Sequence, residues 1–297
     1  MKKRILAAGV ACLLLAACST GTTNPSTGGS STTTPVTGNK VRIAMIPTIT
    51  GIPYFQTVKQ GVDEAAAELG DQVEVIWTGP TTTEASAQVS IVQNMINAKV
   101  DVIAIAANDK EALAPVLQQA LDAGIHVMTW SDDASVREIN VQLIDPDVFG
   151  ATLVDQLVEQ TGEQAHVAVL SATPTSPNQT AWLAGIKKRI AEAHSGVVID
   201  TVEYVGEDQE AAMNRTKDLI RSNPNLNGII TIVSPALPGA AQAIESMGVQ
   251  GKVALVGNSL PNGIRQYFKT GTLKKAILWN PIDDGYLNVY TALALAK

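Results

Sequence analysis

The first clear pattern of buried positions runs from Val41 to Leu69. Residues 41–46 are almost continuously apolar, which is typical of a parallel strand that helices cover on both faces. The apolar residues that follow recur at helical spacing and stop at Gly70, so we predict a helix that packs back onto the sheet. Its first residues, Tyr54 and Phe55, are expected beyond the carboxyl end of the first strand, where open α/β sheets hold their ligands.

Strand and helix patterns alternate through the rest of the chain. Further strands are predicted over 73–77, 100–106, 125–130, 137–143, 166–170, 197–205, 228–233, 252–256 and 275–279. This alternation predicts an α/β fold with two doubly wound parallel-sheet lobes, joined by a hinge, with a ligand cleft between them. Because the rhythm breaks near 134–140, we expect the chain to cross between the lobes there. The first lobe is then expected to contain residues 40–134 with 252–297, and the second lobe residues 135–251.

The N-terminal residues 1–17 have the pattern of an export signal. A short basic head precedes an apolar run of about a dozen residues, which is too short to span a bilayer and is typical of a signal peptide. The run ends in Leu15, Ala16, Ala17 and Cys18, which resembles the lipobox of bacterial lipoproteins, where cleavage precedes the cysteine and the thiol is lipidated. An ordinary cleavage site followed by an incidental cysteine is the alternative.

Residues 18–39 are expected to join a lipidated Cys18 to the folded part of the chain. Apart from Val36, the segment after Cys18 contains only Thr, Ser, Gly, Pro and Asn. Such a composition cannot offset the entropy lost on ordering, so we predict a flexible tether. The expected location is the outer face of the cytoplasmic membrane, or the periplasm, with a lipid anchor. Because the only other cysteine is Cys12, in the signal peptide, no disulfide is expected in the folded part.

Charge and motif content argue against several classes of function. The formal net charge is −7, and it falls to −10 without the three basic residues of the head, which disfavours nucleic acid as a partner. His126, His166 and His194 lack metal-ligand spacing to a second histidine or cysteine, so no metal site is expected. The sequence has no nucleophile elbow, phosphate-binding loop or dinucleotide fingerprint. We therefore expect neither a cofactor nor an enzyme.

Polar or aromatic residues recur just after the predicted strands. They are Thr48, Ser131 with Asp132, Ser171 with Thr173, Ser234, Asn258 with Ser259, and Asn280 beside Trp279. Any one of them is explained as a turn former. Since six loops are expected to converge on one cleft, together they predict hydrogen-bonding groups for a polyhydroxylated ligand. Asp283 and Asp284 are interpreted instead as acidic residues that favour a helix N-terminus.

Several ordered groups of residues resemble those of a known family. They are Ile46, Pro47 with Tyr54, Phe55; Thr78, Gly79, Pro80, Thr81; Thr129, Trp130; Trp182; Leu237, Pro238 with 240–243; Val256, Gly257 with 260–262; and Leu278, Trp279. Over residues 41–297 the chain is similar to type I periplasmic binding proteins, the solute receptors of ABC importers. It is most similar to the branch that contains the rhamnose-binding protein and the autoinducer-2 receptor. The resemblance implies hinge closure around the ligand and a membrane permease as partner, and we expect a monomer.

The autoinducer-2 receptor can be compared with this chain position by position. That receptor has a lysine, an aspartate, an Asp-Gln pair before the shared tryptophan, and later a proline and an alanine. The corresponding residues here are Thr48, Ser131 followed by Asp132, Asn178 and Gln179 before Trp182, and Ile232 and Ser234. Only the glutamine is retained, and charged groups are replaced by neutral ones. This departure favours an uncharged sugar over autoinducer-2 as the ligand.

The expected function is capture of such a sugar by a lipoprotein of an ABC importer. The alternative is a sensor that reports a sugar-like or autoinducer-2-like signal to a chemoreceptor or a membrane kinase. The candidate ligand-binding residues are Thr48, Tyr54, Phe55, Ser131, Asp132, Asn178, Gln179, Trp182, Ile232, Ser234, Ser259, Trp279 and Asn280. Similar proteins continue beyond the last predicted helix. Because this chain stops within that helix at Lys297, we expect a C-terminal truncation.

Overall fold

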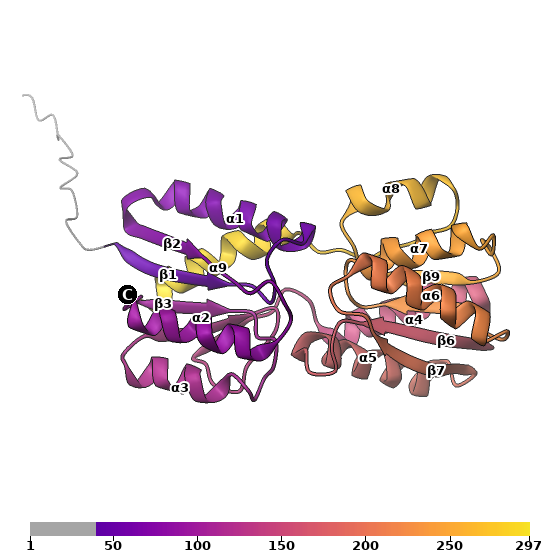
Figure 1. Ribbon diagram of the computed structural model, residues 1–297, viewed down its shortest axis with the longest axis horizontal. Helices are drawn as coiled ribbons and strands as arrows, with labels where there is room; N and C mark the ends of the chain where they lie inside the picture. The colour runs from indigo at the N-terminus through magenta and orange to yellow at the C-terminus, as the bar shows by residue number, and fades with distance from the viewer. Residues whose placement is uncertain (1–39) are drawn as a thin grey trace, which may run out of the picture. The chain divides into compact units, whose positions relative to one another are not determined.

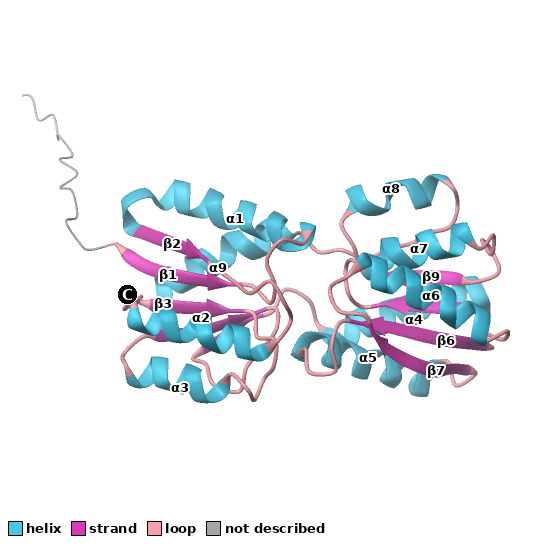
Figure 2. Cartoon of the chain, viewed as in Figure 1, coloured by secondary structure: helices cyan, strands magenta, loops and turns pink. Residues whose placement is uncertain are grey.

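The computed structural model of this protein describes residues 40–297. The predicted signal peptide, Cys18 and the predicted tether lie outside these described residues. Two parallel sheets form the framework of the described part (Figure 1). The first has five strands in the order β2-β1-β3-β4-β5, and the second has four in the order β7-β6-β8-β9. Helices cover both sheets (Figure 2), as the predicted α/β class requires.

The first lobe is built on the five-stranded sheet. Its strands are β1 (Val41–Ile46), β2 (Val73–Trp77), β3 (Val102–Ile105), β4 (His126–Trp130) and β5 (Ile139–Val141). Its helices are α1 (Pro53–Leu69), the short 3-10 helix η1 (Gly70–Gln72), α2 (Ala85–Asn97), α3 (Ala114–Asp122) and, from the end of the chain, α9 (Pro281–Leu295). Figure 1 shows α9, in yellow, among the indigo and purple elements of this lobe.

The second lobe is built on the four-stranded sheet. Its strands are β6 (Ala165–Ser171), β7 (Val197–Tyr204), β8 (Gly228–Thr231) and β9 (Ala254–Gly257). Its helices are α4 (Pro146–Thr161), α5 (Pro177–Ala193), α6 (Gln209–Ser222), α7 (Ala236–Ser246) and α8 (Pro261–Lys269). The chain enters this lobe after β5 and leaves it before α9.

The core lies on both faces of each sheet. In β1, Ile43 and Met45 pack in one cluster with residues of α1 and α9, while Ala44 and Ile46 pack in another with residues of α2 and α3. Successive side chains of a strand point to opposite faces, so a strand covered twice is apolar at every position. The second sheet has the same arrangement, with α6, α7 and α8 on one face and α4 and α5 on the other. This confirms the doubly wound lobes that the sequence predicts.

Glycines allow two helices on the same face of each sheet to pack closely together. A Cβ atom added to Gly285 of α9 would lie 2.0 Å from the carbonyl oxygen of Val58 in α1. In the second lobe, a Cβ atom added to Gly150 of α4 would lie 2.4 Å from the carbonyl carbon of Gly185 in α5. Both distances are shorter than van der Waals contact. Each pair of helices can therefore pack this closely only because glycine has no side chain.

The predicted lobe boundaries need two corrections. The strand at 139–141 pairs with β4, so it belongs to the first lobe and the crossover follows it. Residues 254–257 pair with β8 in the second sheet, and α8 packs against α7, so only α9 returns to the first lobe. The predicted strand at 275–279 is reduced to one bridge between Asn258 and Ile277, because the chain leaves the sheet there for the first lobe.

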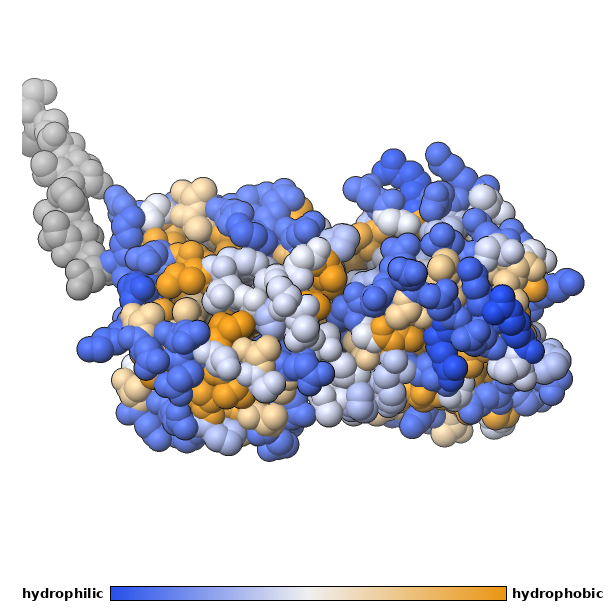
Figure 3. Space-filling model, in the orientation of Figure 1, coloured by the Kyte–Doolittle hydropathy of each residue, from blue (hydrophilic) through white to orange (hydrophobic). Residues whose placement is uncertain are grey.

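The visible surface mixes hydrophilic and hydrophobic residues over both lobes (Figure 3), and neither lobe presents a uniformly apolar face in this view. Within residues 40–297, every helix is too short or too polar to cross a bilayer.

Candidate functional site

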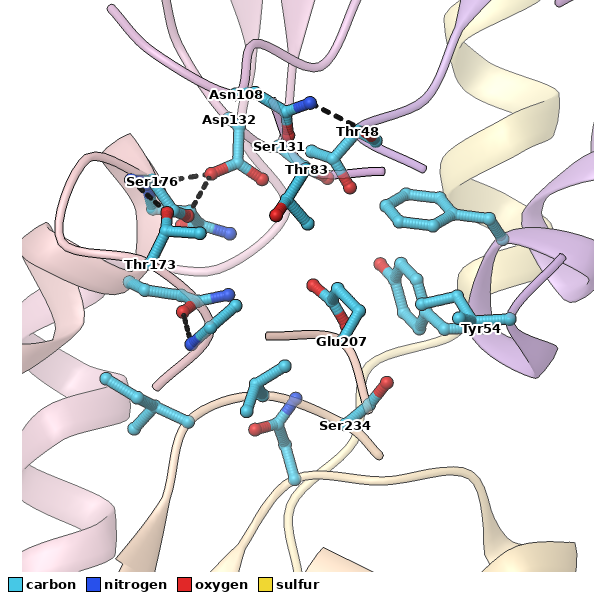
Figure 4. A pocket seen from close by; sticks show the side chains of 18 of the residues that line it. Thr48, Tyr54, Thr83, Asn108, Ser131, Asp132, Thr173, Ser176, Glu207 and Ser234 are labelled. Atoms are coloured by element: carbon cyan, nitrogen blue, oxygen red, sulfur yellow. Dashed lines mark hydrogen bonds between the residues drawn. The ribbon is translucent and has the colours of Figure 1, made fainter. Parts of the chain in front are cut away.

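A cleft lies between the carboxyl ends of the two sheets, where their loops face each other (Figure 4). First-lobe residues that line it are Thr48, Ile52, Tyr54, Phe55, Thr83, Asn108, Ser131 and Asp132. Second-lobe residues are Ala172, Thr173, Ser176, Asn178, Gln179, Trp182, Glu207, Ile232, Val233, Ser234 and Asn258, and Trp279 comes from the segment that joins the lobes. The position agrees with the rule that open α/β sheets bind ligands beyond their carboxyl ends.

The structure brings eleven of the thirteen predicted ligand-binding residues to this cleft. Ser259 lies outside it, in two grooves around α8. Asn280 also lies outside it, because its Oδ1 accepts a hydrogen bond from the Ile282 backbone N–H at 3.1 Å and caps α9. Residues that cap helices and residues that bind sugars are of the same type and follow strands alike, so the pattern alone could not separate them.

Aromatic rings from both lobes form one wall of the cleft. The Tyr54 ring lies 5.1 Å from that of Phe55 and 5.9 Å from that of Trp279, measured between ring centroids. The Trp279 ring in turn lies 5.6 Å from that of Trp182 in the second lobe. All three pairs meet edge to face, an arrangement that contributes about 0.5–1.5 kcal/mol per pair beyond burial. The rings therefore stabilise the cleft while offering apolar surface to a ligand.

Asp132 connects the two lobes at the edge of the cleft. From the loop after β4, its Oδ1 accepts hydrogen bonds from Ser176 Oγ at 2.8 Å and from the Asn178 backbone N–H at 3.0 Å (Figure 4). Both donors belong to the N-terminus of α5, where the helix dipole favours a negative charge. Burial raises the pKa of Asp132 to about 6, although these two hydrogen bonds act to lower it. The first lobe thus supplies the carboxylate that caps a helix of the second.

Amides of α5 add directed hydrogen-bonding groups. The Oε1 atom of Gln179 accepts hydrogen bonds from Ser171 Oγ and the Ala172 backbone N–H, both at 2.6 Å. The Oδ1 atom of Asn178 accepts one from Gln142 Nε2 at 3.2 Å. Because both oxygens are engaged within the protein, the two NH₂ groups are left as donors toward the cleft.

Three buried polar atoms of residues that line the cleft have no hydrogen-bond partner within the described part of the protein. They are Thr48 Oγ1, Trp182 Nε1 and Asn258 Oδ1. Leaving a buried donor or acceptor unpaired costs about 1–3 kcal/mol, so a ligand that pairs with one of these atoms recovers part of this cost. Thr48 belongs to the first lobe and the other two residues to the second, so a ligand that contacts Thr48 and either of them is bound by both lobes.

Four polar residues of the cleft are not among those that the sequence predicts: Thr83, Asn108, Ser176 and Glu207. Asn108 and Glu207 each lie three residues after the end of a strand, so the pattern of polar residues after strands also points to them. Desolvation by the cleft walls, and then the Asp132 charge, raise the pKa of Glu207 to about 8, although part of this residue still reaches solvent. None of the described residues that line the cleft is a lysine, arginine or histidine.

Asp284 is not simply the acidic residue at a helix N-terminus that the sequence suggests. Its side chain is fully buried behind the cleft wall, where it accepts hydrogen bonds from Ser131 and Tyr54. Desolvation raises its pKa to about 6. The exposed Asp283 fits the original interpretation. Over residues 40–297, the structure contains no group of three or more His, Cys, Asp and Glu residues that could hold a metal ion.

The raised pKa values predict that the free protein loses stability as the pH rises from about 4 to 8. In this range the folded protein holds protons on Asp132, Asp284 and Glu207 that the unfolded chain releases, so deprotonation disfavours the folded state. A shift of the pKa from 3.8 to about 6 in one buried aspartate changes the free energy of unfolding by on the order of 3 kcal/mol. His194, whose pKa is raised mainly by its hydrogen bond to Glu163, acts in the same direction.

Urea unfolding at several pH values measures this effect. The Glu207→Gln variant tests the contribution of Glu207. In this variant the free energy of unfolding should change less between pH 6 and about 8 than it does in the wild type. A free energy of unfolding that increases between pH 5 and 7 contradicts the prediction.

Comparisons with known proteins agree with the geometry. Residues 43–297 match the family described as periplasmic binding protein domain. The D-ribose/D-allose-binding protein of Pseudomonas aeruginosa is 27% identical over 267 residues, which cover 87% of this chain and 83% of that protein. An ABC transporter solute binding protein from Clostridium phytofermentas, with bound L-rhamnose, has a TM-score of 0.83 and 28% sequence identity. The match covers 86% of this chain and 81% of the solved chain.

A second solved structure has a similar fold. LsrB from Clostridium saccharobutylicum, in complex with AI-2, has a TM-score of 0.80 and 26% identity over 86% of this chain and 82% of its own. These two structures represent the rhamnose and autoinducer-2 branch that the sequence motifs indicate. Since the family match covers nearly all described residues, the chain belongs to the periplasmic binding protein domain family, as a type I member similar to that branch.

Proposed function

We propose that this chain captures an uncharged sugar in the cleft and delivers it to the membrane permease of an ABC importer. The observation that carries the proposal is the composition of the cleft, which combines an aromatic wall with neutral hydroxyl and amide groups from both lobes. A sugar presents an apolar ring face and a rim of hydroxyls that both donate and accept. Neutral hydrogen bonds contribute about 0.5–1.5 kcal/mol each, so several must act together with ring stacking.

The charge of the cleft supports a ligand without negative charge. Asp132 and Glu207 are the acidic residues that line it, and no basic residue among the described ones balances them. An anionic sugar would face these carboxyls without a cation to pair with, which is unfavourable in a desolvated site. The relatives named with D-ribose, D-allose and L-rhamnose support a neutral monosaccharide.

A thermal-shift screen tests the proposed function. The panel contains L-rhamnose, D-ribose, D-allose, D-arabinose and D-fucose, with autoinducer-2 and glucuronate as the ligands that we expect to be rejected. A ligand at a hundred times its dissociation constant stabilises the folded state by about 2.7 kcal/mol, which is readily detected. Stabilisation by glucuronate alone, or by no sugar of the panel, contradicts the proposal.

The two kinds of group in the cleft should have different effects on specificity. Phe55→Ala removes ring surface, so we expect it to weaken all accepted sugars to a similar degree. Thr48→Val removes a buried hydroxyl with no partner in the protein. We expect it to lower the affinity only for sugars whose hydroxyl groups hydrogen-bond to Thr48. It should also stabilise the free protein by about 1 kcal/mol.

Titration calorimetry against the accepted sugars checks both expectations. The control is Phe268→Ala, which removes an exposed phenylalanine of α8 outside the cleft and should change no affinity. If Thr48→Val leaves every affinity unchanged, Thr48 does not contact the ligand.

We further propose that Cys18 carries the lipid that anchors the protein at the outer face of the membrane. The support is the basic head, the apolar run and the small residues before Cys18, followed by a tether that lacks charge. Cys18→Ser should abolish lipid attachment and processing at this site. Mass spectrometry of the mature N-terminus checks the prediction, and a wild-type N-terminus other than an acylated Cys18 contradicts it.

A further inference from the structure

A carboxylate of the last helix lies directly behind the cleft wall. Asp284 is fully buried and does not line the cleft. Its Oδ2 accepts hydrogen bonds from Ser131 Oγ at 3.0 Å and from Tyr54 OH at 3.3 Å, and its Oδ1 accepts one from Asn288 Nδ2 at 2.9 Å. Ser131 and Tyr54 both line the cleft (Figure 4). The carboxylate therefore adjoins the cleft through two side chains without lining it.

These hydrogen bonds determine where the hydroxyl protons point. An ionised carboxylate has only lone pairs, so the Ser131 and Tyr54 hydroxyls must both donate to Asp284. The Tyr54 oxygen also accepts a hydrogen bond from Trp279 Nε1 at 2.8 Å, which links the Trp279 ring to the same network. The Ser131 oxygen is left with lone pairs that can accept a hydrogen bond from a ligand.

Stability does not account for a carboxylate at this position. Asp284 takes part in no ion pair among the described residues. The titratable groups that face it are Tyr54 of α1 and Asp132 of the loop after β4, and neither is a cation. A buried carboxylate without a cation disfavours folding, and its raised pKa reflects this.

We infer that Asp284 is a positioning residue for ligand binding, which orients the Ser131 hydroxyl as an acceptor toward the ligand and fixes the rings of Tyr54 and Trp279. The inference rests on the proposed function, because it requires a ligand hydroxyl that donates to Ser131. The backbone at Ser131 supports it independently. With φ at 56°, Ser131 has a left-handed conformation, which a non-glycine residue keeps only where its surroundings hold it. Its N–H donates to the Val141 carbonyl at 3.0 Å, so both backbone and side chain are held.

Two aspartate variants of the same helix provide a matched test. Asp284→Asn replaces the acceptor by an amide that can also donate, so we expect roughly tenfold weaker binding in titrations with L-rhamnose and D-ribose, for whichever of the two binds. Asp283→Asn makes the same charge change at an exposed position and should alter affinity by less than about twofold. Equal affinities of the wild type and Asp284→Asn overturn the inference.

A double-mutant comparison separates positioning from general structural support. If Asp284 acts through the two hydroxyls, Asp284→Asn should weaken binding no further in a chain that already carries Ser131→Ala and Tyr54→Phe. A second loss of the same size in that chain overturns the inference. Failure of the proposed function has a different outcome, because then neither the wild type nor any variant binds a sugar.

A measurement without ligand covers the case in which Asp284→Asn does not fold. The emission of Trp279 is obtained by subtracting the spectrum of the matched Trp279→Phe variant, since the chain has four tryptophans. We expect the Trp279 emission of the wild type to shift as Asp284 titrates near pH 6, and Tyr54→Phe to abolish the shift. A Trp279 emission that stays constant from pH 5 to 8 overturns the inference.

Discussion

Replacing Gly285 by alanine is expected to destabilise the protein by about 3 kcal/mol, because the added methyl group has no space between α9 and α1. Its Cβ atom would lie 2.0 Å from the Val58 carbonyl oxygen and 2.9 Å from the Val62 backbone nitrogen. Across the same contact, a Cβ atom at Gly61 would lie 1.9 Å from the Ile282 carbonyl oxygen. All of these are backbone atoms, so the clash can be relieved only by separating the helices.

The separation should also weaken ligand binding. Helix α9 carries Asp284, and the hydrogen bond from Tyr54 OH of α1 to this carboxylate is already 3.3 Å long. Moving the helices apart breaks that bond and releases the Tyr54 ring from one side. We therefore expect Gly285→Ala to lower sugar affinity by roughly tenfold, in addition to its effect on folding.

Urea unfolding of Gly285→Ala and Gly263→Ala measures the effect with a matched control. Gly263 is also a helical glycine, in α8, but a Cβ atom there meets nothing within 4 Å. Its replacement should stabilise the protein by up to about 1 kcal/mol, because alanine has less conformational entropy to lose. Equal unfolding midpoints for the two variants contradict the proposed helix contact.

The fold could be predicted from the sequence because its main determinants are local. The continuous apolar run of β1 reflects a strand buried on both faces, and the stop at Gly70 reflects a positive φ of 57°. Which of the two sheets a late strand joins does not depend on the local sequence. β9 is equally apolar whichever sheet it extends, and only its pairing with β8 places it in the second lobe.

The candidate site could be predicted in part for a similar reason. Residues after strands reach the cleft because parallel strands end at one edge of the sheet, and the sequence therefore predicts Thr48, Asp132 and Ser234. Burial of a carboxylate depends on contacts that are distant in sequence. Asp284 lies 153 residues from Ser131, its hydrogen-bond partner, and nothing near it in the chain distinguishes it from the exposed Asp283.

We propose that the contact of Asp132 with α5 couples ligand binding to a movement of the lobes. Asp132 is 8% exposed, and both of its hydrogen-bond donors lie in the other lobe. If the lobes part about the hinge, Asp132 and the α5 N-terminus are both exposed to water, so their hydrogen bonds favour only the arrangement in which the lobes meet. A ligand that bridges the cleft favours the same arrangement, and the two effects reinforce each other.

Asp132→Ala is therefore expected to weaken every accepted sugar by about tenfold to a hundredfold, because closure then leaves the Asn178 N–H and the Ser176 hydroxyl without their acceptor. Ser176→Ala removes one donor and should have a smaller effect, while Asp63→Asn, at an exposed position of α1, should have none. Calorimetry measures the affinities, and small-angle scattering measures the radius of gyration of the ligand-free protein. If Asp132 holds the lobes together, the ligand-free Asp132→Ala variant should have a larger radius of gyration than the ligand-free wild type. If affinity falls in Asp132→Ala while the radius of gyration of the ligand-free protein remains that of the wild type, Asp132 contacts the ligand and does not hold the lobes together.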